Sequence, residues 1–97
     1  MKEHDFEIFL SAEPTITSKD KAVATRMRKA RKAESVLGYS LDVAVSDDDL
    51  MYESIIALQP QEDPAHTPMQ NAVRKYYKFV NGKEFPKLRY YHSPKHP

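Results

Sequence analysis

Apolar side chains recur at steps of three and four residues in several stretches of the chain, which is the spacing of one face of an α-helix. The first stretch is DFEIFLSAE, residues 5–13, in which Phe6, Phe9 and Leu10 share a face. Pro14 follows directly, and the residue before a proline avoids the helical region of backbone conformation. The pattern therefore predicts a short first helix that ends before Pro14.

The second stretch is the longest and predicts a helix that ends at Leu37. Thr17 or Ser18 can cap its first turn, where Asp20 complements the exposed amides. Gly38 follows the helix and can adopt the left-handed conformation that ends many helices. An apolar stripe predicts the face that packs on the core, and it consists of Val23, Met27, Ala30 and Leu37, with Ala33 and Val36 alongside.

A third helix is predicted to end before Pro60, and a short turn precedes it. The stretch SLDVAV, residues 40–45, is too short to classify by periodicity, and we interpret it as a turn packed on the core. Residues 46–49 then offer several side-chain oxygens that can cap a helix. The predicted buried face of this helix consists of Leu50, Met51, Ile55 and Leu58.

The fourth helix has the clearest start signal. Thr67 can cap it, Pro68 suits the first helical position, and Gln70 stands three residues after the cap, so a reciprocal capping box is predicted. The helix is expected from Pro68 to about Val80, with Asn81-Gly82 as its end. Its predicted core face consists of Met69, Val73, Tyr76 and Val80. Aromatic residues in the following KEFPKLRYYHSPKHP are expected to dock on the bundle.

These elements predict an all-α fold, a single small bundle of four main helices with a short turn element between helices two and three. The length suits one domain, 1–97, with its core over about 5–88 and a loose tail over 89–97. No stretch approaches the length of a membrane-spanning helix, and the N-terminus does not resemble a secretory signal. We therefore expect a soluble cytoplasmic protein with no membrane partner.

Composition and spacing argue against several kinds of chemistry. The chain has no cysteine, which excludes disulfides, thiolate zinc sites and thiol nucleophiles. Asp47, Asp48 and Asp49 suggest helix capping rather than a metal site, because consecutive residues diverge around a helix. The histidines are scattered, and no nucleophile stands in a recognisable elbow or glycine-rich turn. We expect no catalytic activity, no cofactor and no metal.

The net charge of +1 hides a sorting of charge along the chain. Residues 1–17, 18–32, 33–73 and 74–97 carry −3, +6, −8 and +6, respectively. If the two basic segments meet in space, they form a patch that can attract a polyanion. A merely solvated charged face and a contact with an acidic protein are the other interpretations of the segment 18–32.

Two tyrosine pairs, Tyr76-Tyr77 and Tyr90-Tyr91, stand among bases. Such a mixture can contact phosphates and stack on nucleobases. Core packing is the competing interpretation. Adjacent side chains on a helix point about 100° apart, so this interpretation places Tyr76 in the core and Tyr77 at its boundary.

The order of the elements resembles a known family. The resemblance rests on the order of FEIFLSAE, TITSKD, the long basic helix, the acidic-capped third helix, and NAVRKYYKFVNG followed by KEFP. With this order the chain resembles, over residues 5–88, the N-terminal core-binding, SAM-like domain of phage integrases and other tyrosine recombinases. In that family the domain is a small helical bundle that clamps DNA, mostly through backbone phosphates. The resemblance implies DNA as a partner and a separate, missing catalytic domain, so no residue of this chain receives a catalytic role. The acidic segment 33–73 departs from the family's pattern.

The sequence thus predicts a non-catalytic DNA-binding module that contacts phosphates through a basic helix. The alternative is a protein-interaction or adaptor module of a phage-related or defence system that binds no nucleic acid. The phosphate contacts are expected from bases of the two basic segments, namely Arg26, Arg28, Lys29, Arg31, Lys32, Arg74, Lys75 and Lys78.

Overall fold

The computed structural model describes residues 1–13 and 19–91, and within them the chain is all-helical. The main helices are α1 (Glu3–Ser11), α2 (Lys19–Leu37), α4 (Asp48–Leu58) and α5 (Pro68–Asn81). The shorter elements are α3 (Leu41–Ala44) and the 3-10 helices η1 (Gln59–Gln61) and η2 (Leu88–Tyr90). The predicted fold, a bundle of four main helices with a short element between the second and third, is confirmed.

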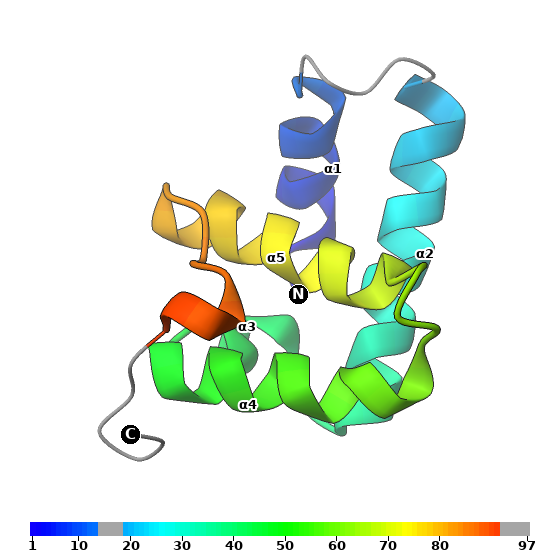
Figure 1. The fold of residues 1–97 in the computed structure, drawn as a ribbon. Helices are drawn as coiled ribbons and strands as arrows, with labels where there is room; N and C mark the ends of the chain where they lie inside the picture. The colour runs from blue at the N-terminus through cyan, green and yellow to red at the C-terminus, as the bar shows by residue number, and fades with distance from the viewer. Residues whose placement is uncertain (14–18, 92–97) are drawn as a thin grey trace.

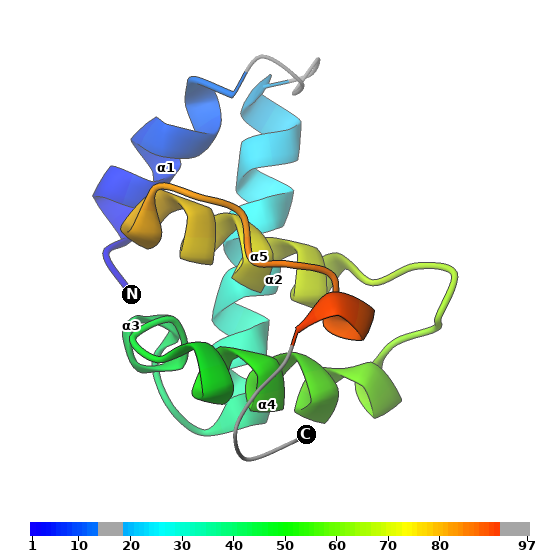
Figure 2. The same ribbon diagram turned by 60° about the vertical axis from the view of Figure 1, so that its left-hand side comes forward.

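Two pairs of helices cross each other (Figure 1). α1 and α2 stand side by side and run in opposite directions, while α4 and α5 run across them. α5 packs against both α1 and α2, and α4 packs against α2, α3 and α5. Beyond α5 the chain doubles back along that helix and reaches α4 through η2 (Figure 2). The two basic helices, α2 and α5, are therefore neighbours.

The core lies where the helix pairs cross. Its aromatic centre is Phe6 of α1, whose ring centroid lies 4.9 Å from that of Tyr76 and 5.7 Å from that of Phe79. Full burial of a large apolar side chain contributes roughly 1.5–3 kcal/mol, so this cluster ties α1 firmly to α5. The buried apolar residues are Phe6, Leu10, Val23, Met27, Ala30, Ala33, Leu41, Ala44, Val45, Met51, Ile55, Leu58, Met69, Ala72, Val73, Tyr76, Tyr77 and Phe85.

Several positions differ from their predicted burial. Leu50, predicted on the buried face of α4, is only partly buried and is not among the side chains packed on the core. Val36 and Val80 are 39% and 47% exposed, because both lie in the last turn of their helices, beyond the crossing. Tyr77 was expected at the boundary of the core but is buried. The returning chain places Phe85 against it, with ring centroids 5.1 Å apart. The doubling back of the chain after α5 therefore buries a second side of that helix.

The start of α5 is capped by a residue that the pattern did not indicate. Thr67 makes no capping hydrogen bond with its side chain. Instead the carboxylate of Glu62 accepts hydrogen bonds from the backbone amides of Met69 and Gln70, at 2.6 and 3.1 Å. A carboxylate at this place also lies at the positive end of the helix dipole. The prediction of a capping box at Thr67 is therefore wrong.

The other helix ends in the described residues follow the predictions. Gly38 and Gly82 have φ angles of 82° and 75°, the left-handed conformation expected after α2 and α5. Asp47 caps α4 by accepting a hydrogen bond from the amide of Leu50 at 3.0 Å. The caps predicted at Thr17 and Ser18 lie outside the described residues.

The segments predicted to be a turn and a loose tail both contain packed residues. Within residues 40–45 the single helical turn α3 lies between the caps Ser40 and Val45, and Leu41, Ala44 and Val45 are buried, so the predicted turn packed on the core is confirmed. In the segment 89–97, Tyr91 donates a hydrogen bond to Asp49 and packs against the core. Residues 92–97 lie outside the described residues.

Candidate nucleic-acid interface

A groove with basic walls runs between α2 and α5. It consists of two adjoining hollows of about 480 and about 410 Å³, and Arg26 of α2 and Asn71 of α5 line both. The chain around Phe85, which returns along α5, forms a further wall. Among the described residues, the bases that line this basic groove are Lys21, Arg26, Lys29, Arg74, Lys75, Lys78 and Lys87, and the acid is Glu84.

The basic groove brings together only part of the predicted contact set. Its lining includes Arg26, Lys29, Arg74, Lys75 and Lys78. These five bases come from two helices that lie about 50 residues apart in the chain and meet because the bundle folds back on itself.

The other three predicted residues point elsewhere from α2. Arg28 and Lys32 are exposed and do not line the groove. Arg31 turns toward α1, where its Nη2 lies 2.6 Å from Oε1 of Glu3 and its Nε donates to the same oxygen at 2.8 Å. Successive helical residues are rotated by about 100°, so a continuous run of bases cannot share one face.

Two groove bases, Lys21 and Lys87, were not among the predicted contacts. Helical spacing places Lys21 about 20° from Arg28 and about 80° from Lys29, so the spacing groups Lys21 with bases outside the groove and gave no signal for it. Lys87 had no spacing signal either. Its position depends on the return of the chain along α5 (Figure 2).

Arg74 holds the returning chain against α5. Its Nη1 donates to the carbonyl oxygens of Phe85 and Pro86 at 3.1 and 3.3 Å, and its guanidinium lies 5.8 Å from the centroid of the Phe85 ring. Burial lowers the pKa of Arg74, while the nearby charge of Glu84 opposes this. An arginine side chain nevertheless stays charged at neutral pH. Arg74 therefore both shapes the groove and adds to its charge.

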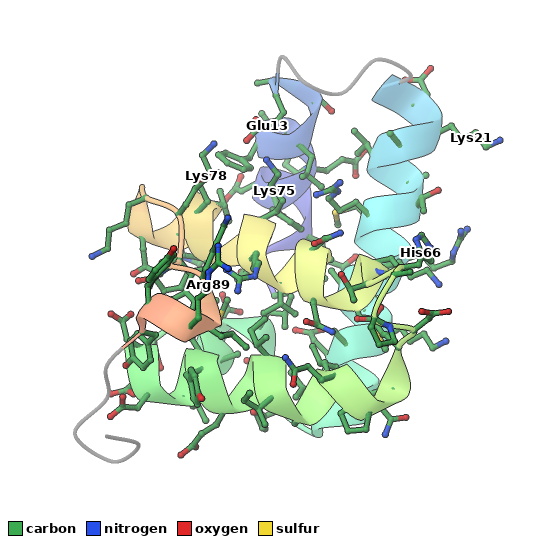
Figure 3. The ribbon with its side chains drawn as sticks, in the orientation of Figure 1. Glu13, Lys21, His66, Lys75, Lys78 and Arg89 are labelled. Carbon is green, nitrogen blue, oxygen red and sulfur yellow. The ribbon has the colours of Figure 1, made fainter. Side chains whose placement is uncertain are left out.

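Glu13 is a buried carboxylate behind two of the groove lysines. Its Oε1 lies 3.6 Å from Nζ of Lys75 and 3.6 Å from Nζ of Lys78, and the residue is only 8% exposed. Figure 3 shows Glu13 at the end of α1 above the two lysines on α5. One carboxylate between two ammonium groups leaves this part of the groove positively charged.

The acids of segment 33–73 serve largely as internal partners of tyrosines and helix ends. The hydroxyl of Tyr77 donates to Asp48 at 2.7 Å, and Glu34 accepts a hydrogen bond from the amide of Leu41 at 2.8 Å. Asp42 and Asp49 likewise accept hydrogen bonds from Tyr76 and Tyr91, and Asp47 and Glu62 cap α4 and α5. Asp63 accepts a hydrogen bond from the amide of Ala65 in the exposed loop before α5. These carboxylates keep their charge, but their hydrogen bonds hold them at helix ends and beside tyrosines, outside the lining of the basic groove.

The first tyrosine pair belongs to the core, as the packing interpretation predicted. Burial, followed by the hydrogen bond to Asp48, raises the pKa of the Tyr77 hydroxyl to about 12. Burial and the hydrogen bond to Asp42 likewise raise the pKa of Tyr76. Both rings are buried, so neither is exposed to stack on a base.

Asp42 joins Tyr76 to the start of the chain. The amine of Met1 lies 2.8 Å from Oδ2 of Asp42, and the backbone amide of Lys2 donates to the Tyr76 hydroxyl at 2.8 Å. Burial alone would raise the pKa of Asp42, but hydrogen bonds from the amine and from Tyr76 outweigh it and lower the pKa. This network fixes α1 and α3 to α5.

The described residues contain neither a metal-binding cluster nor a membrane-spanning helix. Across residues 1–13 and 19–91, no group of three or more histidine, aspartate or glutamate side chains is arranged to hold a metal ion. No helix in this part of the chain is long and apolar enough to cross a membrane. The histidine pair of the tail, His92 and His96, lies outside the described residues.

Comparison of the chain with protein-family models, with curated proteins and with solved structures found no match. The resemblance to integrase core-binding domains therefore stays a prediction. The functional assignment rests on the geometry and charge of the basic groove.

Proposed function

We propose that this chain is a non-catalytic DNA-binding module whose basic groove holds the phosphate backbone. The observation that carries the proposal is the meeting of two separate basic helices along two adjoining hollows, whose combined lining has seven bases and one acid. Phosphate oxygens are bound by lysine and arginine side chains in most protein–DNA contacts, and such contacts carry little sequence information. The expected binding is therefore largely independent of base sequence.

The distribution of opposite charge supports an anionic ligand. Among the described residues, ion pairs occupy Lys75 and Lys78, which share Glu13, and Arg31, which lies outside the groove. Lys21, Arg26 and Lys29 have no carboxylate within 4.0 Å in that part of the chain. Unpaired cations beside one another repel, so a bound polyanion would relieve that repulsion.

The expected salt dependence follows from the number of available cations. Seven bases line the groove, and Glu13 and Glu84 each offset about one unit, which leaves about five charges to face phosphates. For duplex DNA the logarithm of the binding constant falls with the logarithm of salt concentration by about 0.9 per contact, or about 4.5 for five contacts. Raising salt from about 50 to about 200 mM should weaken binding by roughly 500-fold.

Fluorescence anisotropy with labelled DNA at the two salt concentrations tests the proposal. The key variant is the charge reversal Arg26→Glu with Lys29→Glu, which alters the groove. The matched control is Arg28→Glu with Lys32→Glu, which makes the same charge change on exposed positions of the same helix outside the groove. We expect the groove variant to lose binding and the control to retain most of it.

Three outcomes would overturn the proposal. They are no binding at low salt, binding that salt does not weaken, and equal losses in the two double variants, which would indicate a response to overall charge. A pull-down that recovers an acidic protein, with no DNA binding, would favour the protein-interaction alternative.

A further inference from the structure

The last described segment, residues 83–91, is held on the bundle by contacts at both of its ends. At its start, Phe85 is buried against Tyr77, and Arg74 binds the carbonyl oxygens beside it. At its end, Tyr91 stacks on Tyr52 with ring centroids 5.3 Å apart and donates a hydrogen bond to Asp49. The residues between these anchors therefore have a fixed position relative to the basic groove.

Tyr90 lies in this fixed segment and takes no part in the core. It is 63% exposed, and it is the only aromatic residue among the exposed large apolar side chains of the part of the chain described. Its neighbours Leu88 and Tyr91 both pack against the core, so the turn η2 directs Tyr90 outward. An exposed ring on a pinned element can offer a ligand the face that Arg89 does not cover.

Basic side chains flank Tyr90 on the side toward the groove, while Asp47, Asp48 and Asp49 lie on the side of the neighbouring Tyr91. The guanidinium carbon of Arg89 lies 4.9 Å from the centroid of the Tyr90 ring, a distance at which a cation is attracted to an aromatic face. Lys87, three residues before Tyr90, lines the basic groove. In Figure 3, Arg89 extends from η2 on the side of α5 that also carries Lys75 and Lys78. A strand that follows the groove past Lys87 thus reaches an aromatic ring and an arginine.

We propose that Tyr90, with Arg89 beside it, stacks on an unpaired nucleobase, so that the preferred ligand of the basic groove is single-stranded DNA. This inference rests on the proposed function and adds the class of its ligand. Proteins that bind single strands combine a cationic path for the backbone with aromatic side chains for the bases. The bases of a duplex are already stacked on each other and do not offer a free face to the ring.

The test compares strands with and without bases. The probes are fluorescein-labelled dodecathymidine and an abasic strand of the same length and charge. Because both carry the same phosphates, the groove contributes equally to each, and the ring contributes only to the first. We expect wild-type protein to bind the strand with bases about 5- to 30-fold more tightly than the abasic strand.

Variants at position 90 assign that difference to the ring. We expect Tyr90→Ala and Tyr90→Leu to bind both strands equally, because neither side chain has an aromatic face. Leucine restores apolar bulk, so it separates stacking from a general apolar contact. Tyr90→Phe keeps the aromatic ring and should keep the preference for the strand with bases. The exposed position predicts unchanged thermal stability for all three variants, which circular dichroism checks. Quenching of 2-aminopurine in a single strand gives a second readout of stacking, and Tyr90→Ala should abolish it.

The results separate this inference from the proposed function. Equal binding of both strands by wild-type protein, or a preference that survives in Tyr90→Ala, overturns the stacking role while the groove still binds phosphates. Failure of both single strands to bind at low salt, with duplex DNA still bound, overturns the stacking role alone, and failure of the single strands and of duplex DNA overturns the proposed function as well.

Discussion

Glu13→Gln should change stability and DNA affinity in opposite directions. The carboxylate is almost buried and lies 3.6 Å from the ammonium groups of Lys75 and Lys78, which are partly exposed. Glutamine keeps the shape of the side chain and removes its charge. Because the two ion pairs are partly screened by solvent, we expect the free energy of unfolding to fall by about 1–2 kcal/mol. For a domain of this size the midpoint of thermal unfolding should drop by about 5–10 °C.

The same substitution should strengthen DNA binding. Without Glu13, Lys75 and Lys78 lose the carboxylate that offsets their charge, and the groove gains one unit of positive charge. One further phosphate contact releases about 0.9 of a counterion, which corresponds to roughly 8-fold tighter binding at about 0.1 M salt. The slope of affinity against salt concentration should steepen by about 0.9.

Thermal unfolding followed by circular dichroism and anisotropy titrations measure the two effects on the same preparation. Glu84→Gln is the matched control, because Glu84 also lines the groove but is exposed and has no ion pair among the described residues. It should raise affinity without lowering the unfolding midpoint. If Glu13→Gln destabilises the protein but leaves affinity unchanged or weaker, then Lys75 and Lys78 do not face the bound phosphates, and the reasoning fails.

Further predictions concern the fold and are checked by equilibrium unfolding. Glu62→Ala should lower the free energy of unfolding by about 1–2 kcal/mol, because two first-turn amides of α5 lose their acceptor. Thr67→Ala should change the free energy of unfolding by less than about 0.5 kcal/mol. Equal effects of the two substitutions would contradict the observed cap. Gly82→Ala should lower the free energy of unfolding by about 1–2 kcal/mol and Gly82→Asn by less, because residue 82 has a φ of 75° and no atom would clash with a new side chain. Equal losses in the two variants would show that the left-handed backbone conformation is not the cause. The pKa of Tyr77 is raised to about 12, so its contribution to stability should be complete below about pH 10, the value for the unfolded chain, and be lost as pH rises through about 12. The alkaline loss of stability should be smaller in Tyr77→Phe, and an identical pH profile would show that Tyr77 does not titrate with folding.

Local pattern was sufficient for the helices because each has a periodic apolar face and its own end signals. The stripe from Val23 to Ala33 is buried, and Gly38 and Gly82 end their helices in the left-handed conformation. Contacts that depend on the return of the chain were not predictable in this way. The capping of α5 by Glu62, and the burial of Tyr77 under Phe85, each join residues that no helical period relates.

The candidate site was predictable to the same extent. The apolar stripe of α2 fixes the rotation of the helix and places Arg28 and Lys32 opposite the core, but it could not select which bases at its edges face α5 and which face α1. Arg28 and Arg31 stand within three residues of Lys29, yet the first is exposed outside the groove and the second pairs with Glu3. Lys87 joins the groove only through tertiary structure.

The near-neutral charge of the chain is consistent with an anionic ligand because the acids of segment 33–73 and the bases of the groove lie in different parts of the molecule. In segment 33–73, acids cap helices and accept hydrogen bonds from buried tyrosines, and none of them lines the basic groove. Lys21, Arg26 and Lys29 make no such contacts within the described residues and stay at the wall of the groove. Net charge therefore understates the positive potential that a ligand meets at the basic groove. It follows that neutralising Asp48 or Glu62 should mainly reduce stability, whereas neutralising Arg26 or Lys29 should mainly reduce DNA binding. If replacing the groove bases abolishes DNA binding and leaves stability unchanged, these bases form a ligand-binding surface. Charges that serve only to keep the protein solvated would not produce this result.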